Sequence, residues 1–326
     1  MLASRILQQQ ETLLGAFLTS ASAVVDDPPV GSPARADLDL IRQAGDESGL
    51  VGLRAWMHRS CALNVFAAHE HAQALRIVAM GDELLPIPAM SLARSVLEAV
   101  INTCWLLDAE ACSEERLARW AGRLLHDSQE TPAVLAVVPQ EVVRDDERQD
   151  ADEGRELGQR LMQRAGFTLK AKGGDRSTDT ANVSFRGSKS NLTPKVDSVL
   201  GRFAPGEEHL WPMLSGATHS RGWLVAGLAG DEATVITSCI TPVLAASDAL
   251  VVEVGRYLDL PVRAVLERTH THRVAILNRA RPGRDFRARL DTYRASVGAW
   301  AVPNDAAELH ATTPEPEPEP SRSSSG

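Results

Sequence analysis

Aromatic residues are scarce in this chain, and so are the signals that mark β-hairpins. Only two tyrosines occur among 326 residues, and phenylalanine, tryptophan and tyrosine together make up 4%. No run alternates apolar and polar residues as a half-buried strand does, and no hairpin dipeptide lies between apolar runs. The sequence therefore predicts minimal β-structure.

Cysteine clusters and a secretory signal are also missing. The four cysteines, Cys61, Cys104, Cys112 and Cys239, form no C-x-x-C pair. A structural zinc site needs tighter clusters than these. The first ten residues lack the continuous apolar segment of a secretory signal. We therefore expect free thiols and a cytoplasmic location.

Motifs for cofactors and metals are absent or incomplete. The chain contains neither G-x-x-x-x-G-K-[ST] nor G-x-G-x-x-G, so we expect no nucleotide cofactor. Glu267-x-x-His270 matches half of a di-iron bundle signature, but that site needs a second Glu-x-x-His and two more glutamates. We expect no metal site.

Charge of one sign does not dominate the chain as a whole. It carries 34 basic and 43 acidic residues, net −9, which excludes a strongly basic whole-protein footprint for nucleic acid. Glu141–Glu156 holds eight acids and three arginines, whereas Arg160–Lys195 and Arg263–Arg289 each hold eight bases and two acids. Two interpretations stay open: solvated faces that neutralise one another, or a local basic surface for phosphate or RNA.

What the chain does have is helical periodicity over most of its length. The fold class that we predict is all-α, a multi-helix bundle of two packed halves. The segments are an N-terminal helical half at 1–165, a polar basic loop at 166–192 (its core about 166–191), a C-terminal helical half at 193–302 and a disordered Glu-Pro tail at 303–326. The most membrane-like stretch, Val235–Val254, contains Pro242, Asp248 and Glu253. We interpret it as a buried core helix, and expect no membrane contact.

Met90–Asp108 is predicted to be a helix that is apolar around most of its circumference. Arg94, Glu98 and Asn102 lie at i, i+4 and i+8, so they form one polar stripe. On a central helix such a stripe needs polar partners or faces a cavity. It is a solvated edge, a structural ion pair or one wall of a functional cleft.

A second polar group lies on the stretch His209–Leu228. Ser215 and His219 share one helical face at i, i+4, and Ser220 follows. Such a histidine is either a packing residue at a helix interface or a ligand-binding residue. A nucleophilic serine is not favoured, because no G-x-S-x-G elbow is present.

The stretches LARSVLEAVINTCWLLD and LWPMLSGATHS resemble a family of all-helical actinobacterial proteins, a domain of unknown function. Its members show an Arg-x-x-x-Glu helix ending in Trp-Leu-Leu-Asp and a later Leu-Ser-x-x-x-His helix. The resemblance spans approximately Met90–Leu228 without the intervening loop. It implies a helical fold and a shared polar cluster of Arg94, Glu98, Ser215 and His219, and no established activity.

The same layout is loosely similar to HEPN-type helical domains, many of which are RNases in toxin and antiphage systems. Those nucleases carry an arginine that is directly followed by a polar residue, and four to six residues separate this arginine from a histidine. Three pairs here have six intervening residues, namely Arg119…His126, Arg202…His209 and Arg263…His270. None has a polar residue after the arginine, so the motif is absent or degenerate.

The sequence is therefore compatible with two functions. The first is a non-enzymatic helical protein that binds a partner or a small anionic ligand in a cleft lined by Arg94, Glu98, Asn102, Ser215, His219 and Ser220. The alternative is a HEPN-like, metal-independent RNase or toxin with Glu98 and His219 as its acid–base pair. A homodimer joined through apolar helix faces is a further expectation.

Overall fold

A computed structural model describes residues 2–45, 48–80, 85–139, 141–171, 180–219, 221 and 232–280. Helices dominate these residues, which confirms the predicted all-α class. The helices are α1 (Leu2–Val24), α2 (Pro33–Ala44), α3 (Leu50–Val78), α4 (Pro86–Leu107), α5 (Ser113–Val137), α6 (Asp145–Arg164), α7 (Val196–Phe203), α8 (Leu210–Thr218), α10 (Glu232–Leu258) and α11 (Arg263–Ala280).

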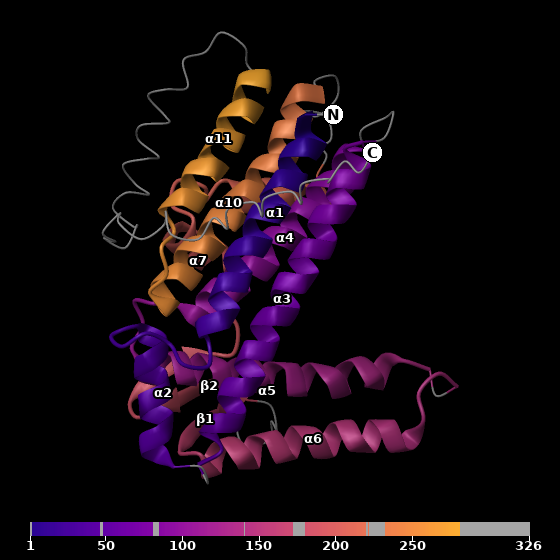
Figure 1. Ribbon diagram of the computed structural model, residues 1–326. Coiled ribbons are helices and arrows are strands. Elements are labelled where there is room, and N and C mark those ends of the chain that lie inside the picture. The colour runs from indigo at the N-terminus through magenta and orange to yellow at the C-terminus, as the bar shows by residue number, and fades with distance from the viewer. Residues whose placement is uncertain are drawn as a thin grey trace, which may run out of the picture.

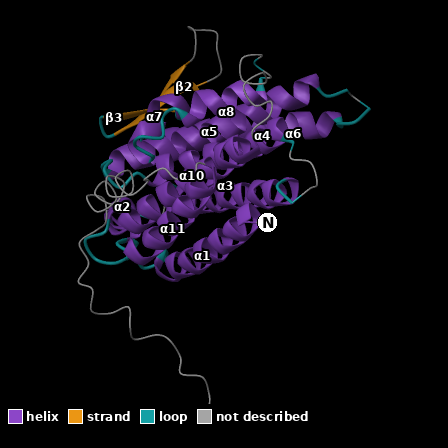
Figure 2. Ribbon diagram, turned by 90° about the horizontal axis from the view of Figure 1, so that it is seen from above, coloured by secondary structure: helices purple, strands orange, loops and turns teal. Residues whose placement is uncertain are grey.

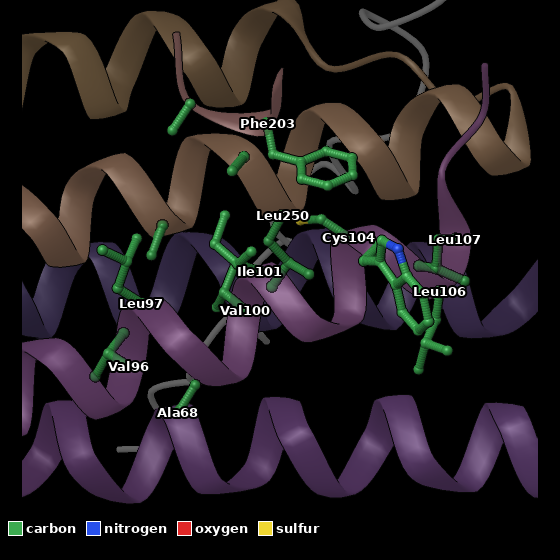
Figure 3. Packing of buried hydrophobic residues seen from close by; sticks show 14 of the residues in the cluster. Ala68, Val96, Leu97, Val100, Ile101, Cys104, Leu106, Leu107, Phe203 and Leu250 are labelled. Atoms are coloured by element: carbon green, nitrogen blue, oxygen red, sulfur yellow. The ribbon is translucent and has the colours of Figure 1, made fainter. Parts of the chain in front are cut away.

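The long helices α1, α3, α4, α10 and α11 lie side by side as a bundle (Figure 1). Helix α4 is its centre, since it packs most extensively against α3 on one side and α10 on the other (Figure 3). Buried apolar side chains cover most of its circumference, among them Leu97, Ile101 and Cys104. The helix is apolar almost all round because neighbours cover it on several sides.

Helix α10 is the most hydrophobic element of the bundle. Val235–Leu258 is long and apolar enough to cross a membrane, yet 78% of its most apolar window is buried inside the protein. It contacts α4, α1 and α11. Its hydrophobicity is thus satisfied by neighbouring helices, as in a core helix.

Helices α5 and α6 form a hairpin that extends sideways from the lower end of the bundle (Figure 1). Glu114 and Glu115 lie in the first turn of α5, where carboxylates interact favourably with the helix dipole. Figure 2 shows a small sheet at one edge of the molecule, and α1 and α11 toward the opposite edge.

The segment predicted as a polar loop at about 166–191 contains three strands instead. They are β1 (Phe167–Ala171), β2 (Thr180–Phe185) and β3 (Ser188–Asn191), paired antiparallel in the order β1-β2-β3. The prediction was wrong because each strand is short and carries few apolar residues. In the sheet, the rings of Phe167 on β1 and Phe185 on β2 stack, with their centroids 4.5 Å apart.

The turn between β2 and β3 explains why the hairpin escaped the sequence analysis. Arg186 and Gly187 both adopt positive φ, 47° and 91°, as a two-residue type I′ turn requires. An arginine at the first position is not a usual hairpin signal. The sheet packs on α5 closely enough that a Cβ at Gly122 would lie 2.9 Å from the carbonyl oxygen of Asn191.

Two predicted segments lie outside the described residues. One is the end of the C-terminal helical half, from residue 281 to 302, and the other is the Glu-Pro tail at 303–326.

Candidate functional site

The predicted polar stripe of α4 is present, and its arginine serves as a contact between helices. Arg94 Nε lies 3.9 Å from Glu98 Oε2. The Arg94 guanidinium also lies 4.7 Å from the ring centroid of Trp211, on α8. A cation over an indole face stabilises the packing of two helices. Arg94 therefore has a structural role at the interface between α4 and α8. Asn102, the third residue of the stripe, lies half-buried two turns further along α4.

The α8 residues of the predicted cluster lie on the last turn of that helix and at its C-terminal end. Ser215 is half-buried on α8, but the helix ends at Thr218, so His219 is its exposed C-cap residue. Across the described ranges, no hydrogen bond or ion pair joins His219 to Glu98. Ser220 lies outside the described residues.

The arginines of the three Arg…His pairs are engaged in ion pairs. Arg119 pairs with Asp108 at 2.6 Å, Arg202 pairs with the same carboxylate at 2.6 Å, and Arg263 pairs with Glu267 at 3.1 Å. Each arginine therefore already has an anionic partner within the protein.

Asp108 is a buried charge centre at the end of α4, and the sequence analysis missed it. Its side chain is 1% exposed, and its two carboxylate oxygens accept hydrogen bonds from Arg119 and Arg202. A buried carboxylate needs such partners to offset its lost hydration. The Trp-Leu-Leu-Asp sequence thus has a structural role here, because it joins α4, α5 and α7.

The last carbonyl groups of α4 are satisfied by the same helix α5. Arg119 donates to the carbonyl oxygen of Trp105 at 2.8 Å, and the indole N–H of Trp120 donates to that of Leu106 at 2.8 Å. Helix ends leave such carbonyls without intrahelical partners. The α4–α5 corner is therefore rigidly held by side chains.

Glu253, on α10, lies beside this corner. Its buried carboxylate has weaker polar contacts than that of Asp108. It accepts a hydrogen bond from the Ala109 N–H at 3.3 Å, and Arg256 lies 3.6 Å away. Burial, with smaller contributions from nearby Asp108 and Glu110, raises the pKa of the Glu253 carboxyl to about 7, against the opposing effects of the Ala109 hydrogen bond and of Arg256.

A cavity of about 970 Å³ lies between α1, α3, α4 and α10. Its wall is mostly apolar, with side chains such as Leu14, Val65, Val100 and Leu250. Figure 3 shows Ala68 of α3 facing Val96 and Val100 of α4 across this region. Exposed wall residues, including Phe66, open it to solvent.

Several small residues line the cavity. Gly15, Ala21, Ala62, Ala68 and Ala72 all contribute to its wall. A Cβ added at Gly15 would meet no atom within 4 Å. Interiors of folded proteins are normally close-packed. The small side chains on α1 and α3 therefore contribute little volume to this space.

The cavity is elongated along the helices. Helices α1 and α3 are antiparallel, since Gln73 donates to Glu11 at 3.0 Å and Arg54 donates to the Val25 carbonyl. The wall residues of α3 run from His58 to Arg76. At 1.5 Å per residue, that segment is about 27 Å long.

Most polar groups in the wall are already paired. Glu11 accepts the hydrogen bond from Gln73 and lies 3.6 Å from His69. Tyr257 donates to Asp37 at 3.0 Å. Burial, with a contribution from Arg54, lowers the pKa of His58 to about 4, so this histidine is neutral at pH 7.

Arg76, at the other end of α3, is the exception. Its Nε is buried and has no hydrogen-bond partner. No ion pair to it occurs within the described part of the chain. An unpartnered buried donor is costly unless a ligand or water satisfies it.

Other site classes find little support in the described ranges. No group of three or more His, Cys, Asp and Glu side chains there could hold a metal ion. The four cysteines are free thiols, of which Cys104 and Cys239 are buried, Cys61 is half-buried and Cys112 is exposed. No family model, no curated protein and no solved structure gave a significant match to the chain.

Proposed function

We propose that this protein binds an elongated apolar small molecule in the cavity between α1, α3, α4 and α10. One observation supports this most strongly: an apolar space of about 970 Å³ in which most polar wall groups are paired. Small-molecule sites in proteins are concave, largely apolar and typically about 300–1,000 Å³. The cavity lies at the upper end of that range.

Water is a poor occupant of this space. A bound water needs two to four polar partners, and the apolar wall offers few groups that are not already engaged. An alkyl chain has no such requirement. Each methylene transferred from water into the wall contributes about 0.8 kcal/mol, so a chain of about ten contributes roughly 8 kcal/mol before the costs of association.

The cavity and the cleft predicted from the sequence are different places in the fold. The sequence placed a ligand beside Arg94, Glu98, Ser215 and His219, whereas the cavity lies on the opposite side of α4, toward α1 and α3. The anionic-ligand cleft at α8 and the RNase alternative stay predictions.

The experiment is a fluorescence titration of the full-length protein with Nile red, a neutral apolar dye. We expect saturable binding with a blue-shifted emission. Ala72→Trp places an indole in the cavity and should weaken binding at least tenfold. Ala55→Trp, on an exposed position of the same helix outside the wall, should leave it unchanged. Equal binding by both folded variants would refute the proposed location.

A further inference from the structure

We propose that the ligand is a single-chain amphiphile with a carboxylate head group, and that Arg76 binds this head group at one end of the cavity. The inference rests on the proposed function and adds the chemistry and the orientation of the ligand. It starts from an arginine in the last turn of α3 that lines the cavity with a buried, unpartnered Nε.

The position of Arg76 on its helix does not by itself satisfy the guanidinium. A cation in the last turn of a helix interacts favourably with the helix dipole, which accounts for the presence of a positive charge there. The dipole supplies no acceptor for the Nε hydrogen, however, and no described carboxylate lies within ion-pair distance. The guanidinium therefore retains donors for an external anion.

The remaining charged groups of the wall do not compete for that anion. Glu11 accepts a hydrogen bond from Gln73 at 3.0 Å and has His69 at 3.6 Å. His58 is neutral at pH 7 and lies 18 positions before Arg76 on α3, toward the far end of the cavity. Within the described wall, Arg76 is thus the one permanent cation without an anionic partner.

The placement of Arg76 sets the orientation of the ligand. It is the last residue of α3 that lines the cavity, whereas Val25, Tyr257 and Leu258 lie near the opposite end. About 27 Å of helix separates His58 from Arg76 at 1.5 Å per residue. A long chain can therefore extend from a head group at Arg76 between the small residues of α1 and α3 toward Leu258.

The charge balance favours a carboxylate over a phosphate monoester. Arginine forms paired, charge-assisted hydrogen bonds with either group. A phosphate monoester carries about −1.5 to −2 charges at pH 7, which exceeds what one arginine neutralises and would add repulsion from Glu11. A carboxylate carries the single charge that Arg76 matches.

The test is displacement of Nile red from the full-length protein by decanoate and by decan-1-ol, which share a chain and differ in the head group. We expect the wild type to bind decanoate at least tenfold more tightly than decan-1-ol. Arg76→Gln should abolish that preference, and Arg76→Lys should restore part of it. Arg59→Gln, an exposed arginine of α3 outside the wall, should retain the preference in full.

The outcomes separate this inference from the proposed function. Saturable Nile red binding without a decanoate preference in the wild type overturns the head-group assignment and leaves the apolar site intact. Tighter binding of decyl phosphate than of decanoate overturns the carboxylate. An undiminished preference in Arg76→Gln assigns the head group to another residue and refutes the role of Arg76. Absence of Nile red binding overturns both proposals.

Discussion

Asp37 and Arg116 form a buried, two-pronged ion pair between α2 and α5. Arg116 Nη2 donates to Asp37 Oδ1 at 2.7 Å and Arg116 Nε donates to Oδ2 at 2.8 Å, with both side chains no more than 2% exposed. Tyr257 of α10 donates to the same carboxylate at 3.0 Å. One carboxylate thus connects three helices beside Tyr257, which lines the cavity.

Removal of one partner of that pair should destabilise the fold strongly. We expect Arg116→Met to lower the free energy of unfolding by about 3–5 kcal/mol, because Asp37 would remain buried without its cation. Urea unfolding measures the change. Arg263→Met is the matched control: its ion pair with Glu267 is exposed, so about 0.5 kcal/mol or less is expected. Similar losses for the two variants would contradict this account.

Glu253 should make stability depend on pH around neutrality. Its folded pKa of about 7 exceeds the ordinary value of 4.5, so the folded state holds this proton more tightly than the unfolded state. The free energy of unfolding should therefore fall as the pH rises from about 5 to about 7, by at most roughly 3 kcal/mol from this group.

The variant Glu253→Gln isolates that contribution. Its amide oxygen can still accept the Ala109 N–H, and it cannot titrate beside Arg256, Asp108 and Glu110. His58 acts in the opposite direction, since its lowered pKa removes stability as the pH falls from 6.5 toward 4. We therefore expect the difference between variant and wild type, measured by urea unfolding, to grow from pH 5 to pH 8. A flat difference would show that Glu253 does not titrate in this range.

Gly15→Leu should stabilise the protein and reduce ligand capacity together. Leucine is favoured over glycine in a helix interior by up to about 1 kcal/mol, and a Cβ at Gly15 meets no atom within 4 Å. The added side chain enters the cavity wall, so Nile red should bind more weakly. Gly52→Leu is the control, since Gly52 is also free of nearby atoms but lies outside the wall. Loss of dye binding in Gly52→Leu would indicate an effect unrelated to the cavity.

The polar cluster at α8 has its own test. The full-length protein is incubated with RNA beside Glu98→Ala and His219→Ala, and degradation is followed together with growth of cells that express each form. Because no hydrogen bond or ion pair joins Glu98 to His219 in the described structure, we expect the three proteins to behave alike. RNA degradation by the wild type that both folded variants lose would establish the nuclease alternative.

The sequence predicted the helices well, and it did not predict the β2–β3 hairpin or the ion pairs of Asp108, for physical reasons. Helical periodicity is a local signal, and α3 and α4 followed it closely. The β2–β3 hairpin has an arginine in its turn, which local rules do not recognise. Asp108 acquires Arg202 as a partner 94 residues away, a relationship that no local pattern encodes.

The cavity was beyond sequence analysis for a different reason. Gly15 and Ala72 look like ordinary residues of amphipathic helices, and only the packing of α1 against α3 shows that the volume between them is not filled. Arg94 illustrates the converse. The sequence shows its i, i+4 spacing from Glu98. Its contact with the Trp211 ring arises from the packing of α8 on α4, which the sequence does not show.

The most direct test of the proposed function is calorimetric titration of the full-length protein with decan-1-ol at several temperatures. We expect one site per chain and a negative heat-capacity change, since apolar surface is removed from water on binding. Ala72→Trp should lose this signal and Ala55→Trp should keep it. The absence of saturable heat from the folded wild type, or an identical isotherm from Ala72→Trp, would contradict the presence of a ligand site in this cavity.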